Sequence, residues 1–96
     1  MTKADIIQSI VAQTGLEKPA VTAIVEAVME TIQKNMVKGE NIYLRGLGTF
    51  LLKKRAAKIG RNITKGTTVN IPAHFIPAFK PCKEFVEEVA AKVKVQ

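Results

Sequence analysis

The chain has 96 residues, of which 47% are hydrophobic, and a formal net charge of +7 at pH 7. This length suits one domain, and the apolar content is that of a globular protein and not of a disordered chain. No apolar run approaches the roughly 20 residues of a membrane span, and one cysteine, Cys82, cannot form an internal disulfide. Residues 1–96 are therefore expected to form a single cytoplasmic domain.

Two helices are predicted within residues 1–40. Thr2 can cap the first, with Asp5 three residues later, and Gly15 stops it. Pro19 suits the first turn of the second, which continues to about residue 38. This helix of about twenty residues would be roughly 30 Å long, and the first helix cannot cover its whole apolar stripe. Residues 1–40 are therefore predicted to be a helical dimerisation region.

The pattern changes to that of β-strands from residue 41 to residue 80. A short strand at residues 42–44 and a glycine-containing turn lead into a longer strand from Thr49 to Ala57. Thr67 to Ala73 is predicted to pair with this strand, which would leave an arm of about residues 55–72 extending into solvent. The last helix, within residues 81–96, is predicted to begin near Cys82 or Lys83, with Phe85, Val86, Val89 and Val93 on one side.

The positive charge belongs to the predicted β region. Residues 41–83 hold nine lysines and arginines and no acid, whereas residues 1–40 and residues 84–96 each have a net charge of −1. A field of one sign without internal neutralisation repels itself, so a polyanionic partner is expected.

The order and spacing of several motifs resemble the bacterial histone-like HU and integration host factor family. They are Gly46-Leu47-Gly48-Thr49-Phe50, then Arg55, Gly60-Arg61-Asn62, Gly66 and Pro77-Ala78-Phe79-Lys80. The resemblance implies an α+β fold: two N-terminal helices and a short C-terminal helix as a base, a three-stranded antiparallel sheet, and an extended β-hairpin arm. It further implies an intertwined homodimer on the nucleoid that bends and compacts double-stranded DNA without sequence specificity. Insertion of the arms into the minor groove is the established DNA-binding mode of this family.

The candidate DNA-binding residues fall into three groups. Arg61 and Asn62 suit minor-groove insertion. Ile63 stands where the family commonly has a proline that wedges between base pairs, and it is predicted to intercalate. The remaining cations are predicted to contact phosphates, Lys3 through the resemblance alone; they are Lys3, Lys53, Lys54, Arg55, Lys58, Lys65, Lys80 and Lys83. The family's usual basic residue after the tip glycine is absent, and Lys65 precedes Gly66 instead.

The large apolar and aromatic residues are interpreted as core and not as base-stacking platforms. Those predicted for the dimer core are Val28, Met29, Ile32, Tyr43, Leu44, Leu47, Phe50 and Phe79. His74 is expected to form a hydrogen bond at a strand end, Cys82 to be a small structural residue, and Arg45 to pair with an acid of the helical body. With no nucleophile–base pair, carboxylate pair or ligand cluster, we expect no enzyme, no metal, no cofactor and no small-molecule substrate.

Four alternatives to the non-specific architectural function are considered, of which the helix-turn-helix repressor is rejected. A site-preferring regulator like integration host factor is the nearest. An RNA-binding protein is less favoured because no aromatic platform appears. In a helix-turn-helix repressor the recognition helix needs base-reading side chains, and the second helix here begins with little besides Lys18. A binder of anionic membranes would need a basic amphipathic helix, whereas these lysines lie mostly on strands.

Overall fold

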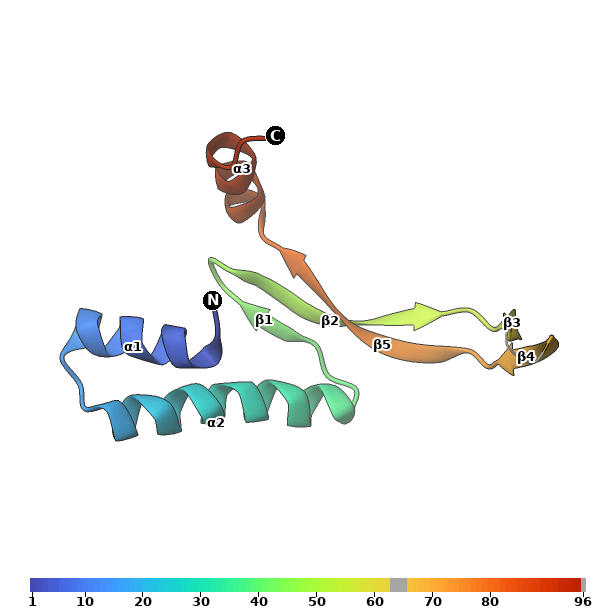
Figure 1. The fold of residues 1–96 in the computed structure, drawn as a ribbon, viewed down its shortest axis with the longest axis horizontal. Helices are drawn as coiled ribbons and strands as arrows, with labels where there is room; N and C mark the ends of the chain where they lie inside the picture. The colour runs from blue at the N-terminus through green and yellow to red at the C-terminus, as the bar shows by residue number, and fades with distance from the viewer. Residues whose placement is uncertain (63–65, 96) are drawn as a thin grey trace.

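The computed structural model describes residues 1–62 and 66–95, with only the backbone of residues 61, 62 and 67. Two helices come first, followed by five strands and a last helix. The elements are α1 (Lys3–Thr14), α2 (Lys18–Val37), β1 (Ile42–Leu44), β2 (Gly48–Arg55), β3 (Lys58–Asn62), β4 (Thr67–Ile71), β5 (His74–Pro81) and α3 (Lys83–Lys92). In Figure 1, α1 and α2 lie side by side below the sheet, and α3 stands apart from both at the end of β5.

Helix α1 is bounded by the capping residues that the sequence predicts. The Asp5 backbone N–H donates to the Thr2 hydroxyl at 3.3 Å, and the Thr2 backbone N–H donates to the Asp5 carboxylate at 2.9 Å. The Thr2 hydroxyl also donates to the Asp5 carboxylate, at 3.0 Å. The bonds that the carboxylate accepts from the backbone N–H and the hydroxyl of Thr2 hold the pKa of Asp5 below its ordinary value. Gly15 ends the helix in the left-handed conformation, with φ of 73°.

The strands form two sheets. One has three strands in the order β1-β2-β5, and the other pairs β3 with β4; all pairs are antiparallel. The predicted pairing of Thr49–Ala57 with Thr67–Ala73 is therefore wrong: β2 pairs with β5, and Thr67–Ile71 pairs with β3. Both sheets belong to one long ribbon whose ladder is interrupted at residues 56–57 on one side and 72–73 on the other. β3 and β4 form the outer end of this ribbon (Figure 1).

The single chain buries very little of its apolar surface. Among the described residues, the buried hydrophobic side chains are Ile7, Val21 and Met36. Its radius of gyration is 18.9 Å, whereas a compact domain of this length has about 12–13 Å. A long ribbon and a separate α3 account for the difference, and they leave apolar faces without a covering layer inside the chain.

Candidate nucleic-acid interface

The three-stranded sheet has two chemically different faces. Side chains alternate across a strand, and directly opposed residues on neighbouring strands share a face. The register therefore puts Tyr43, Thr49, Leu51, Lys53, Arg55, His74, Ile76, Ala78 and Lys80 on one face. The other carries Ile42, Leu44, Phe50, Leu52, Lys54, Phe75, Pro77 and Phe79. We call the first the cationic face and the second the apolar face.

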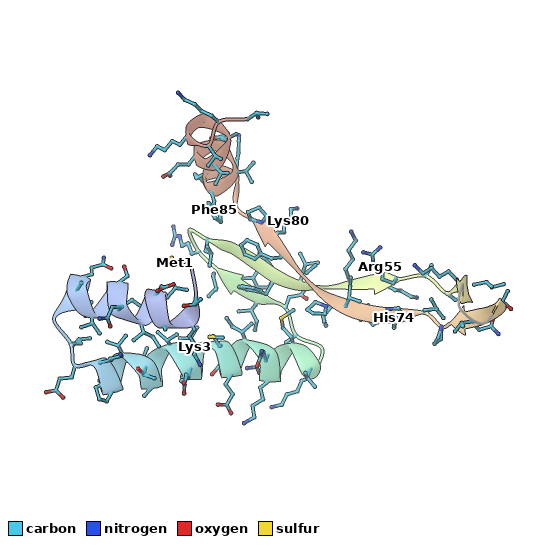
Figure 2. All side chains as sticks on the ribbon, in the orientation of Figure 1. Met1, Lys3, Arg55, His74, Lys80 and Phe85 are labelled. Atoms are coloured by element: carbon cyan, nitrogen blue, oxygen red, sulfur yellow. The ribbon has the colours of Figure 1, made fainter. Side chains whose placement is uncertain are left out.

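Three of the predicted phosphate-binding residues come together on the cationic face. Lys53, Arg55 and Lys80 are all exposed. Lys80 lies at the inner end of the ribbon near α3, and Arg55 lies farther out toward β3 (Figure 2). Within the described part of the chain, every ion pair lies on the helices, so no carboxylate neutralises these three cations. Such a surface suits a partner with many phosphates.

The apolar face turns toward α2. The rings of Phe50 and Phe79, paired across β2 and β5, have centroids 4.9 Å apart in a tilted arrangement. A hollow of about 680 Å³ lies between this face and the end of α2, and Met36, Leu52 and Phe75 are among its lining residues. The helical body thus lies behind the sheet, and the cationic face points away from it.

The strand register places two residues, Lys54 and Tyr43, on the face opposite to the residues with which the sequence groups them. Lys54 lies on the apolar face opposite Phe75, not beside its neighbours Lys53 and Arg55. Tyr43 lies on the cationic face opposite Thr49. Tyr43 and Phe50 are both predicted for the dimer core, but the pleat directs their side chains to opposite sides of the sheet.

The outer ribbon carries the predicted arm residues. Lys58 opposes Ile71 at the start of β3, and the β3 backbone places Arg61 opposite Thr68 and Asn62 opposite Thr67. Lys58 is exposed, and so is Ile59, of which 74% is accessible. Ile63 and Lys65 lie outside the described residues.

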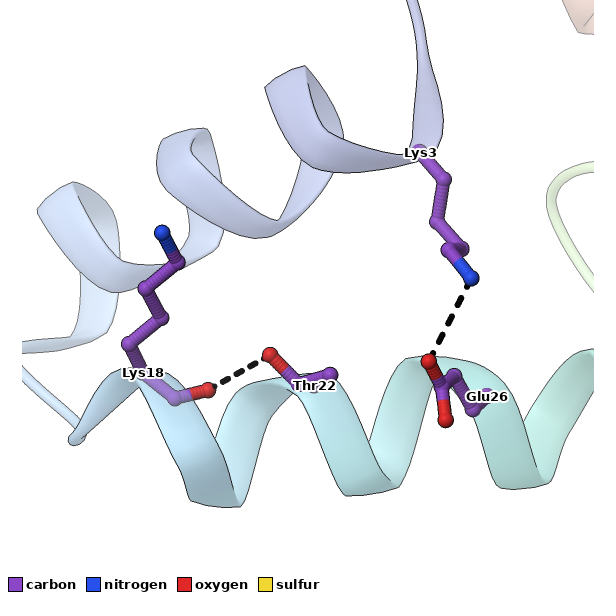
Figure 3. Close-up of polar contacts among 4 residues, drawn as sticks. All are labelled: Lys3, Lys18, Thr22 and Glu26. Atoms are coloured by element: carbon purple, nitrogen blue, oxygen red, sulfur yellow. Dashed lines mark hydrogen bonds and ion pairs between the residues drawn. The ribbon is translucent and has the colours of Figure 1, made fainter.

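Two other predicted phosphate ligands are held by acids on helices. The Lys3 Nζ lies 3.3 Å from a carboxylate oxygen of Glu26, so this ion pair joins the start of α1 to α2 (Figure 3). Lys83, the first residue of α3, lies 4.0 Å from Glu87 one turn later. Both pairs are largely exposed, and such pairs contribute little to stability, so either lysine can exchange its carboxylate for a phosphate at small cost.

Most residues predicted for the dimer core are incompletely covered in the single chain. Val28, Met29, Leu47 and Phe79 are exposed, whereas Ile32, Leu44 and Phe50 are half-buried. An apolar hollow also lies between Phe79 and α3, where Phe85 and Val86 line it. Apolar patches that are this extensive mark a surface that another chain covers.

Three further residues, His74, Cys82 and Arg45, are predicted to have structural and not DNA-binding roles. The His74 Nδ1 lies 2.9 Å from the carbonyl oxygen of Pro72, which can only accept, so this nitrogen carries the proton at the start of β5. Cys82 is half-buried at the N-cap of α3, and its backbone N–H donates to the Leu47 carbonyl at 3.0 Å. Arg45 has no carboxylate within 4.0 Å among the described residues, contrary to expectation.

Residues 1–62 and 66–95 contain neither a metal-binding cluster nor a membrane-spanning helix. No three histidine, cysteine, aspartate or glutamate side chains gather there in a way that could hold a metal ion. None of the helices in residues 1–62 and 66–95 combines the length and the apolar character that crossing a bilayer requires.

Comparison with known proteins gives one consistent family. The model of the family described as bacterial DNA-binding protein matches residues 1–90. The chain is 40% identical to DNA-binding protein HU of Staphylococcus aureus over 93% of this chain and 99% of that protein. It is 39% identical to integration host factor subunit beta of Marinobacter nauticus, over 98% of this chain and 97% of the relative.

Solved structures agree with the fold. A cocrystal structure of Anabaena HU with DNA superposes with a TM-score of 0.88 and 32% identity, over 94% of this chain and 98% of that chain. A variant of HU from Thermotoga maritima gives a TM-score of 0.70 at 29% identity, over 93% and 99% of the two chains. The α+β fold with its β-ribbon is thus the HU fold, and the family is one of architectural DNA-binding proteins, not of enzymes. Sequence motifs, fold and relatives together make the chain a member of the bacterial DNA-binding protein family of HU and integration host factor.

Proposed function

We propose that two copies of this chain form a homodimer that holds double-stranded DNA against the cationic faces of its two sheets and bends it between its two arms. The proposal assigns residues 1–40 to dimerisation, residues 41–80 to the DNA-binding sheet and arm, with the arm at about 55–72, and residues 81–96 to the C-terminal helix.

The division of the sheet into two faces is the observation that carries this proposal. Lys53, Arg55 and Lys80 extend from one face without a carboxylate partner in the described residues. The opposite face is apolar and needs a cover that the single chain supplies only in part. One sheet therefore suits two partners at once, a second protomer below and a polyanion above.

The apolar surface supports a second copy as the partner below. Val28, in the middle of α2, is 50% exposed, and Leu47 and Phe79 are also exposed. Specific interfaces have aromatic and aliphatic side chains at the centre, and these residues provide them. Together with Met29, Ile32, Leu44 and Phe50 they form the proposed dimer core.

For the arms we take the binding mode from the family. HU and integration host factor are themselves the established examples of minor-groove proteins that kink DNA with an inserted apolar side chain. Arg61 and Asn62 near the end of β3 are the proposed groove residues, Ile63 the proposed wedge, and Lys58 and Lys65 the phosphate ligands of the arm. Ile63 keeps a backbone N–H and a free φ, unlike the proline common in the family, so we expect shallower or more variable bends.

Fluorescence transfer between the ends of a short duplex tests the proposal. We expect binding of the wild-type protein to raise the transfer efficiency. Arg61→Ala is expected to weaken binding, whereas Ile63→Ala is expected to spare most of the affinity and reduce the bending. Unchanged affinity of Arg61→Ala would count against the arm contacts, and equal bending by Ile63→Ala would remove the wedge.

The cellular site and the sequence preference belong to the same proposal. A protein with this activity would act on the nucleoid. Its similarity to HU and to integration host factor subunit beta is almost equal, at 40% and 39% identity. Competition between random, nicked and pre-kinked duplexes distinguishes a general compacting protein, which we favour because phosphate contacts dominate the face, from a site-preferring regulator.

A further inference from the structure

Tyr43, the single tyrosine of the chain, is one of its most exposed large side chains. It lies in the middle of β1 and is 75% accessible, whereas its neighbours Ile42 and Leu44 are half-buried on the apolar face. Exposure of this side chain on the cationic face gives it access to whatever that face binds.

The register places Tyr43 in a row of hydrogen-bond donors. It pairs with Thr49 on β2, and Thr49 pairs with Lys80 on β5. Neighbouring strands lie about 4.8 Å apart, so the three side chains leave the sheet within about 10 Å of one another, in a line across the strands. Their ends are a phenolic hydroxyl, an aliphatic hydroxyl and an ammonium, all of which can donate to a phosphate oxygen.

The donors at the two ends of this row have no partner among the described residues. In the described part of the molecule, neither the Tyr43 hydroxyl nor the Lys80 ammonium forms a hydrogen bond or an ion pair. The phosphates are the outermost acceptors of a duplex, and between half and two thirds of protein–DNA hydrogen bonds go to phosphate and sugar, tyrosine being among the donors.

We propose that the Tyr43 hydroxyl donates a hydrogen bond to a phosphate oxygen of DNA beside the phosphate that Lys80 neutralises. The inference rests on the proposed function, because it needs DNA on the cationic face. It adds a neutral donor to a face whose other proposed DNA contacts are cations. A neutral donor contributes affinity without releasing a counterion, so its contribution is independent of salt, unlike that of Lys80.

Tyr43→Phe isolates this contact because it removes only the hydroxyl oxygen. We would measure the dissociation constant for a short duplex by fluorescence anisotropy over a series of salt concentrations, together with the mass of the free protein in solution. Lys80→Ala is the charged comparison. Lys34→Ala, on α2 beside Glu30, is the control for loss of a cation from the helical body.

Tyr43→Phe is expected to weaken binding by about five-fold or more, since a homodimer loses two solvent-exposed hydrogen bonds, taken at the low end of the usual range. The slope of log affinity against log salt should stay at the wild-type value, whereas Lys80→Ala should reduce its magnitude by about 1.8 for two phosphates. Lys34→Ala should change neither quantity.

Three results would overturn the inference. They are wild-type affinity of Tyr43→Phe, a changed salt slope in that variant, and a mass that falls to that of one protomer, which would place Tyr43 in the subunit interface. If Lys80→Ala also binds with wild-type affinity and slope, the proposed function itself fails, because the cationic face then does not meet DNA. The two failures are thus distinguishable.

Discussion

Removing the three cations of the cationic face together should change the salt dependence of DNA binding more than the same loss of charge elsewhere. The change is Lys53→Gln, Arg55→Gln and Lys80→Gln in one protein. These residues share a sheet face and have no carboxylate within 4.0 Å among the described residues. Because each phosphate that a cation neutralises releases counterions, the effect appears in the slope of log affinity against log salt.

The magnitude follows from the number of cations. Three per protomer become six in a homodimer, and at about 0.9 per neutralised phosphate their removal lowers the magnitude of the slope by about 5. Between 50 and 200 mM salt, this difference corresponds to about 10³-fold in affinity that the wild-type protein loses and the triple variant does not. These are upper values, reached when all six cations contact phosphates.

Fluorescence anisotropy with a labelled duplex measures the slope directly. The matched control is Lys34→Gln, Lys38→Gln and Lys92→Gln, which removes the same charge from the helices, where Lys34 and Lys92 pair with acids one turn away. We expect this control to retain most of the wild-type slope. Equal slopes for the two triple variants would refute the reasoning, since they would show that DNA responds to net charge and not to the sheet face.

Three further predictions concern positions that shape or support this interface. Gly48→Ala should lower the free energy of unfolding by about 1–3 kcal/mol or more, because φ is +155° and the added carbon would clash with the Lys80 carbonyl oxygen and lie 2.8 Å from the Pro81 Cα; an unchanged urea midpoint at fixed protein concentration would contradict this. Glu26→Gln should raise affinity for DNA by up to about five-fold at low salt by releasing Lys3, and the gain should vanish when Lys3→Ala is added. The stabilisation from the Asp5 carboxylate should be fully present above its ordinary pKa of 3.8 and be lost as the pH falls through the lowered folded value; acid titration of α1 helicity in wild-type and Asp5→Asn proteins tests this, and identical curves would refute it.

The helices could be predicted from the sequence because their signals are local. The Thr2–Asp5 capping box, Gly15 in the left-handed conformation and Pro19 in the first turn of α2 all lie where the sequence indicates. Each acts within four residues of a helix end, so no knowledge of tertiary contacts is needed.

The pairing of the strands could not be predicted from the sequence. The eight residues of β5 contain Pro77 and Pro81, and proline in a segment argues against a strand. The structure explains the exception, since β5 lies at the edge of the sheet and pairs with β2 alone. An edge strand can hold proline because one side of its backbone needs no partner. The prolines therefore hide β5 in the sequence, which instead predicts the returning strand at residues 67–73.

The candidate site was predictable in composition but not in orientation. The absence of acids from residues 41–83 located the basic segment, and the motifs identified the family. Which cations act together depends on the register, which brings Lys80 onto the face of Lys53 and Arg55 and moves Lys54 away from it. The sequence predicts a core position for Tyr43 because aromatic side chains are more often core than base-stacking platforms. Alternation counted back from Phe50 through the turn would have placed it on the cationic face.

This dependence on register gives the turn at residues 44–48 an importance beyond the connection of two strands. Gly46 and Gly48 both have positive φ, and the turn fixes Leu44 opposite Gly48, from which the rest of the β1–β2 pairing follows. Since side chains alternate with a period of two, a slip of one residue in β2 would carry Lys53 and Arg55 to the apolar side and expose Phe50. The same error would remove the proposed DNA contacts and the apolar face that is proposed to pack against the second protomer. In the proposed function, the alignment of β2 with its neighbours therefore affects dimerisation and DNA binding together.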